Sequence, residues 1–271
     1  MVKLFRSSVS VSDLWVSSND KLSDFYASSW QRGESAVPML AVRLALTAVA
    51  MGILIWSLVD GGSPYWLIYL TNWGLLLITL MSLSGLLVSV VAVRTKPDSD
   101  VGEVPWYIGI YWFIYNITVC LALMISALYW ILLYDPEKQE TRRMFWLDVA
   151  THGFNSCVAV AELLLSRTPL RFLHFYQPFS VAVWYAAFTA IYYVAGGTDA
   201  KGEPYIYTVL DWRNGGQSTA IVFISLGGLL TIYCTLCAVA LARDKISESV
   251  VRMISHDLPP TPPDFLDSRL V

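Results

Sequence analysis

Charged residues are scarce in this sequence. Only 14% of its 271 residues are Asp, Glu, Lys or Arg, against about 25% in ordinary soluble domains. A soluble domain of this length could not cover its surface with so few charges, because 56% of the residues are hydrophobic. The 11 Trp, 15 Tyr and 11 Phe residues exclude disorder for most of the chain. The composition therefore predicts a polytopic membrane protein whose partners include membrane lipids.

A basic excess is also absent. The net charge is −3, whereas nucleic-acid binding depends on clustered Lys and Arg, so no nucleic-acid partner is expected. The predicted loops contain no cysteine, which excludes a loop disulfide. The four cysteines lie in apolar runs without further metal ligands, so packing is the preferred interpretation even for the pair Cys234 and Cys237. No metal or cofactor is predicted, and the sequence identifies no protein partner.

Long apolar runs determine the predicted fold. Crossing about 30 Å of hydrocarbon takes roughly 20 helical residues. Six runs are long enough, and none shows the alternation of a barrel strand. They are Pro38–Val59, Trp66–Val93, Pro105–Tyr134, Phe145–Leu165, Phe172–Ala195 and Ser218–Ala242. The sequence therefore predicts an all-α fold, a single bundle of six transmembrane helices.

The remaining segments are assigned from composition and charge. Residues 1–35 contain no signal-peptide core and are expected to form a cytoplasmic segment, either an amphipathic surface helix or a short cap. Residues 36–243 form the transmembrane domain. Residues 244–271 are expected to form a cytoplasmic, proline-rich, flexible tail, because Leu258–Asp264 contains four prolines. Twelve Lys and Arg residues lie on the face with both termini and five on the other, which predicts cytoplasmic termini.

Ionisable residues within the runs are the most informative feature, since they normally face the interior of a bundle or a cavity. In the fourth run, polar and small residues recur every three or four positions and form one helical stripe. The stripe consists of Asp148, His152, Asn155, Ala159 and Glu162, with the small Ser156 beside it, and Arg43 lies in the first run. Two interpretations remain open: hydrogen bonding between helices, or a polar chamber that forms an active site.

Several polar residues are expected at one depth. Thr71 and Asn72 lie about 8 Å into the second span, and His152 lies about 10 Å into the fourth from the same side. Tyr205 and Asp211 lie in the fifth loop on that face. A hydroxyl beside an imidazole is the minimal set for nucleophilic attack on an ester. Alternatively, the hydroxyl of Thr71 bonds to its own helix backbone.

Four motifs in this region resemble the rolling stone family. They are Tyr69-Leu-Thr-Asn-Trp-Gly74, His152-Gly-Phe-Asn-Ser156, Arg167-Thr-Pro169 and the segment Tyr205–Trp212. The resemblance implies a multipass protein that acts in myoblast fusion and muscle differentiation. It also implies the plasma membrane as the location, with the endoplasmic reticulum as the alternative.

A more distant resemblance is to the androgen-induced membrane hydrolases, which split fatty acid esters of hydroxy fatty acids. That resemblance implies that Thr71 is a threonine nucleophile, with His152 and Asn155 as catalytic positions and an acyl ester as ligand. Asn155 stands where that family has its catalytic histidine, and asparagine cannot act as a general base, so His152 would have to substitute. Asn72, Asp148, Ser156, Tyr205 and Asp211 are expected to line the pocket.

Enzymatic activity is therefore left open at this point. The sequence contains no glycine-rich phosphate loop, H-E-x-x-H motif or G-x-S-x-G motif, and other enzyme classes find no support. A small-molecule or lipid transporter is a third interpretation, because a polar stripe can line a substrate path. Inverted repeats or paired broken helices would favour a transporter, and neither is found.

Overall fold

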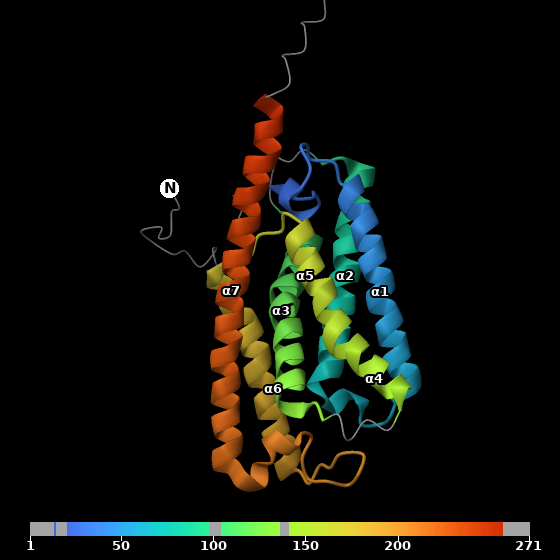
Figure 1. Ribbon diagram of the computed structural model, residues 1–271, viewed down its shortest axis with the longest axis vertical. Helices are drawn as coiled ribbons and strands as arrows, with labels where there is room; N and C mark the ends of the chain where they lie inside the picture. The colour runs from blue at the N-terminus through green and yellow to red at the C-terminus, as the bar shows by residue number, and fades with distance from the viewer. Residues whose placement is uncertain (1–13, 15–20, 98–103, 136–140, 257–271) are drawn as a thin grey trace, which may run out of the picture.

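The computed structural model describes residues 14, 21–97, 104–135 and 141–256. In these residues the secondary structure is helical, apart from one isolated bridge between Ser28 and Ser166. The helices pack lengthwise in a bundle (Figure 1). The predicted all-helical fold is confirmed.

Helices occupy all six predicted apolar runs, some as single α-helices and others combined with a 3-10 or π-helical turn. In chain order they are α1 (Val37–Gly61); η3 (Trp66–Ile68) with α2 (Leu70–Thr95); α3 (Trp106–Leu128) with η4 (Tyr129–Leu133); α4 (Arg142–Val149), η6 (Ala150–Phe154) and α5 (Asn155–Leu165); η7 (Phe172–Phe175) with α6 (Tyr176–Val194); and α7 (Gly215–His256). Two short 3-10 turns, η8 (Thr208–Leu210) and η9 (Trp212–Asn214), precede α7.

Four helical segments of the described chain are long and apolar enough to cross a membrane. They are Val37–Gly61, Leu70–Thr95, Trp106–Leu133 and Thr208–Val251. Large apolar side chains also cover much of the outer surface, among them Leu44, Ile55, Ile131, Trp184, Ile191 and Phe223. Such a surface is unfavourable in water and suits helices that face lipid. The protein is therefore a membrane protein, while crossings by α4–α5 and α6 remain a prediction.

Both ends of the described chain lie at one end of the bundle (Figure 1). A 3-10 turn, η2 (Leu22–Phe25), is buried there, and the backbone N–H of Ser29 donates to the carbonyl of Leu165 at 2.9 Å. Residues 21–35 thus form a short cap on the bundle. At the same end α7 continues to His256, so residues 244–256, expected in the tail, are helical. The proline-rich segment lies outside the described residues.

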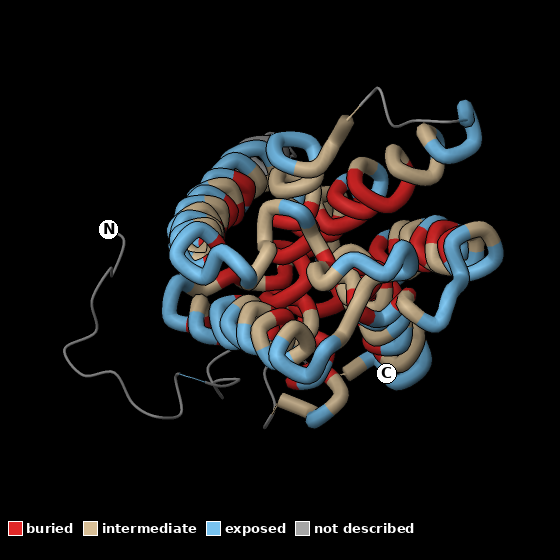
Figure 2. Tube along the Cα trace, turned by 90° about the horizontal axis from the view of Figure 1, so that it is seen from below, coloured by how far each residue is buried: buried red, intermediate tan, exposed pale blue. Residues whose placement is uncertain are grey.

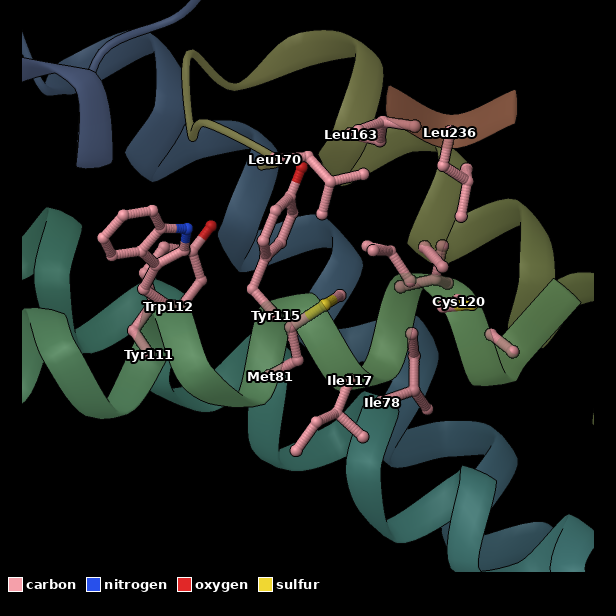
Figure 3. Close-up of a cluster of buried hydrophobic side chains, with 14 of the residues drawn as sticks. Ile78, Met81, Tyr111, Trp112, Tyr115, Ile117, Cys120, Leu163, Leu170 and Leu236 are labelled. Carbon is pink, nitrogen blue, oxygen red and sulfur yellow. The ribbon is translucent and has the colours of Figure 1, made fainter. Parts of the chain in front are cut away.

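The core is built around α3, which contacts α2, α5, α6 and α7. Figure 2 shows the buried residues concentrated along the middle of the bundle. Aromatic side chains of α3 fill much of this space, and Figure 3 shows Tyr115 beside Met81 of α2, with Tyr111 and Trp112 farther along α3. A central helix surrounded by others explains why the third run is apolar on all sides.

The polar stripe of the fourth run faces inward, as predicted. His152, Asn155, Ala159 and Glu162 are buried, and Asp148 is half-buried. Glu162 pairs with Arg43 of α1, whose Nη2 lies 2.8 Å from a carboxylate oxygen. One part of the stripe therefore holds helices together, and a different part, around His152, remains to be explained.

Candidate functional site

The first turn of α2 positions Thr71. Its helix begins at Leu70, and the preceding Tyr69 is extended. The backbone N–H of Leu70 has no partner within the helix, because the first N–H groups of any helix lack one. Two phenol oxygens accept from it instead, that of Tyr207 at 2.9 Å and that of Tyr185 at 3.1 Å. The fifth loop and α6 thus anchor the helix end that carries Thr71.

The π-helical turn η6 positions His152 opposite Thr71. The distance from Nε2 of His152 to Oγ1 of Thr71 is 3.1 Å. On the other side of the ring, Nδ1 lies 3.1 Å from the backbone carbonyl of Asp148 and 3.0 Å from Oγ1 of Thr151. A carbonyl only accepts, so the proton of a neutral ring belongs on Nδ1 and Nε2 is left to accept the Thr71 hydroxyl proton. The expected approach of hydroxyl and imidazole is confirmed.

Side chains of α3 and η4 also hold the imidazole of His152 in place. The ring of Tyr129 stacks flat on His152, with centroids 3.5 Å apart and planes within 5°. Tyr129 also shares a side-chain hydrogen bond with Asp148, and Ser126 donates to the backbone carbonyl of His152. A side chain with its nitrogens and its ring face all engaged has little freedom to turn, which is what a positioned base requires.

Thr71 and His152 open into a polar chamber of about 620 Å³. Two of the segments that line it, η3 and the loop before η8, lie at the lower end of Figure 1, opposite the cap formed by η2. Three of the predicted pocket residues line it, Asn72, Asp148 and Tyr205. The buried Nδ2 of Asn72 donates to the carbonyl of Trp66 at 2.6 Å, so Asn72 holds the chamber wall to the turn before α2.

Three other predicted site residues lie away from the chamber lining. Asn155 is buried deeper in the bundle, where neither side-chain oxygen nor nitrogen has a hydrogen-bond partner among the described residues. The hydroxyl of Ser156 donates to the carbonyl of Ala122 at 2.8 Å. Asp211 pairs with Arg213 at 2.7 Å in the fifth loop. The geometry therefore gives Ser156 and Asp211 structural contacts and keeps Asn155 apart from the nucleophile.

Tyr129 and Tyr185 belong to the site but were absent from the predicted set. Both sit in apolar runs rich in aromatic residues, where one tyrosine is not distinguishable from the others by spacing. Tyr207 lies in the fifth loop, where a polar cluster was expected, and its phenol oxygen accepts from the backbone N–H of Leu70, the residue before Thr71. Burial raises the pKa of Tyr207 above its ordinary value, so its hydroxyl keeps its proton at neutral pH.

Comparison with known proteins identifies the family that this chain resembles. A family model described as "Protein rolling stone" matches residues 2–256. The chain is 33% identical over 228 residues to Protein rolling stone of Drosophila melanogaster, covering 78% of this chain and 80% of the fly protein. No solved structure matches the chain.

Proposed function

We propose that this chain, which belongs to the rolling stone family, is a plasma-membrane protein that hydrolyses the ester bond of an acyl lipid. The observation that carries the proposal is the 3.1 Å contact between Oγ1 of Thr71 and Nε2 of an imidazole oriented through its other nitrogen. A nucleophile, a base and a group that orients the base form the general arrangement of covalent hydrolases. The backbone carbonyl of Asp148 takes the orienting role.

The reaction follows from the positions of the two side chains. Oγ1 of Thr71 attacks the carbonyl carbon of the ester while Nε2 of His152 accepts the hydroxyl proton. The bond from carbon to the alcohol oxygen then breaks, and His152 gives its proton to the leaving alcohol. A water molecule, activated by His152, attacks the acyl-threonine. The carboxylic acid leaves, and Thr71 regains its hydroxyl proton.

The negative charge that develops on the carbonyl oxygen needs nearby donors. The phenol oxygen of Tyr207 accepts from the backbone N–H of Leu70 at 2.9 Å, next to Thr71, so the protonated hydroxyl can turn its own O–H toward the reacting carbon. Thr71 also lies in the first turn of a 26-residue helix, whose N-terminus carries a partial positive charge. We assign Tyr207 and this helix end to stabilisation of the oxyanion.

The membrane arrangement is part of the proposal. Six crossings with cytoplasmic termini would place the chamber at the outer face, because it lies at the end of the bundle opposite the cap. Thr71 near the start of its span would then sit close to the lipid headgroups. An acyl lipid could reach it from the outer leaflet without leaving the membrane.

Labelling with a fluorophosphonate probe for serine and threonine hydrolases tests this activity. The wild type is expected to be labelled, and Thr71→Ala and His152→Ala are expected to lose the label while keeping the melting temperature of the wild type. Thr79→Ala is a matched control, because Thr79 is buried in the same helix and donates only to its own backbone at 2.8 Å. A wild type that is neither labelled nor able to turn over any acyl ester would refute the proposal.

A cellular role in myoblast fusion and muscle differentiation is the second part of the proposal. It is what the resemblance to the rolling stone family implies, and this chain belongs to that family. Loss of the protein from fusing muscle cells is expected to lower the number of nuclei per fibre, and re-expression is expected to restore it. Re-expression of Thr71→Ala then relates the role to the chemistry: failure to restore fusion would tie fusion to hydrolysis, and full restoration would separate them. Normal fibres without the protein would refute the cellular role.

A further inference from the structure

A second cavity lies next to the polar chamber and differs from it in character. It has a volume of about 110 Å³, and its walls come from α3 with η4, from α6 and from α7. Nearly all of its lining is apolar. The lining includes Leu121, Met124, Leu128, Ala182, Ala186, Val222, Leu226 and Leu229.

The two cavities meet at the proposed nucleophile. Four residues line both of them, Thr71, Tyr129, Leu133 and Tyr207. A molecule with its carbonyl carbon at Oγ1 of Thr71 therefore has an apolar space on one side and a polar space on the other. An ester between a fatty acid and a polar alcohol matches these two spaces, since its apolar chain lies on one side of the carbonyl and its polar alcohol on the other.

We infer that the substrate is a single-chain acyl ester whose chain occupies the apolar cavity and whose alcohol occupies the polar chamber. This inference rests on the proposed hydrolysis at Thr71. At about 110 Å³ the apolar cavity has room for a part of one chain and no room for a second chain beside it, which favours a single-chain ester over a diacyl lipid. Because the chain enters from lipid, its close packing against the apolar walls favours binding, and not the removal of apolar area from water.

The charges of the chamber select the alcohol. Four charged residues line it, the acidic Asp148, Asp199 and Glu203 and the basic Lys201. The excess of negative charge repels an anionic alcohol portion and attracts a cationic one. Aromatic rings, including those of Trp66 and Tyr69, also line the chamber and can bind a quaternary ammonium group through their faces. The alcohol of the substrate is therefore neutral or cationic.

Photolabelling tests the position of the chain without requiring catalysis. The probe is an alkyl ether of choline with a diazirine at the end of its chain, and the protein is full-length Thr71→Ala in lipid nanodiscs. An ether cannot be hydrolysed, and this variant has no nucleophile. Labels are expected on cavity residues of α7 such as Leu226 and Leu229. Labels confined to Phe223 and Ile224, which are exposed on the same helix, would overturn the inference.

A pair of neighbouring alanines provides the matched control. Ala186 lines the apolar cavity, whereas Ala187 is exposed on the outer side of α6. Ala186→Phe is expected to fill the cavity and abolish labelling of Leu229, and Ala187→Phe is expected to leave it unchanged. Equal labelling in both variants would place the chain outside the cavity.

Competition by unlabelled ethers of equal chain length tests the alcohol. Choline and glycerol ethers are expected to displace the probe at concentrations roughly fivefold lower than a glycolate ether. The expected factor is small because the charged residues that line the chamber are partly exposed to water, which screens their charges. Strongest competition by the glycolate ether would overturn the assignment of the alcohol. Labelling inside the cavity with no hydrolysis by the wild type would refute the catalytic proposal alone. Hydrolysis by the wild type with labels only outside the cavity would refute this inference alone.

Discussion

Replacement of Arg43 by methionine should destabilise the bundle more than any exposed substitution of the same kind. The guanidinium is buried and bonds to Glu162 through Nε at 3.0 Å and Nη2 at 2.8 Å. It also donates to the carbonyls of Phe25 and Gly85 and to the hydroxyls of Ser89 and Tyr111. One side chain therefore connects the cap, α1, α2, α3 and α5.

The loss of stability in Arg43→Met depends on the Glu162 carboxylate, which loses its charged partner. Without Arg43 the Glu162 carboxylate remains buried with the Tyr111 hydroxyl, 2.7 Å away, as a donor. Breaking a buried ion pair by removing one partner costs about 3–5 kcal/mol, because the other charge is left uncompensated. For a chain of this length that corresponds to a fall in melting temperature of roughly 10 °C. Replacement of both partners by methionine removes the stranded charge and should cost less than the single substitution.

Thermal unfolding in detergent measures these differences. Arg94→Met is the matched control, because Arg94 is exposed at the end of α2 and its loss should shift the melting temperature by only about 1–2 °C, in line with a surface change of about 0.5 kcal/mol. The double variant Arg43→Met with Glu162→Met should melt above Arg43→Met alone. The reasoning is refuted if Arg43→Met has the same melting temperature as Arg94→Met, or if the double variant melts below Arg43→Met.

Three further outcomes are expected. Asn155→Leu should raise the free energy of unfolding by about 1–3 kcal/mol, because it removes a buried amide without a hydrogen-bond partner among the described residues; a lower melting temperature would contradict this. Asn155→His should not restore probe labelling to His152→Ala, because position 155 lies outside the chamber lining; restored labelling would place it at the reacting groups. Tyr207→Phe should lower kcat about 100-fold through loss of an oxyanion donor, with the fold retained; unchanged kcat would remove Tyr207 from the mechanism.

The sequence alone was sufficient for the helices and for which face of the fourth run turns inward. Long continuous apolar runs have one way to satisfy their backbone groups in lipid, and ionisable residues are costly on a surface that faces lipid. The similar depth of Thr71 and His152 was also predictable, since helical rise gives the depth of a residue from its distance along the span. These inferences depend only on the geometry of a single helix, which the sequence of that segment determines.

Rotation and register between helices were decided only by the tertiary structure. The π-helical turn at residues 150–154 changes which residues of the fourth run point into the chamber, so that His152 faces Thr71 and Asn155 does not. A regular 3.6-residue stripe gave no sign of that change. The partners of Arg43, the stacking of Tyr129 on His152 and the junction of the two cavities all join residues far apart in the chain. Such contacts depend on how side chains of several helices pack together, and no spacing within one helix encodes them.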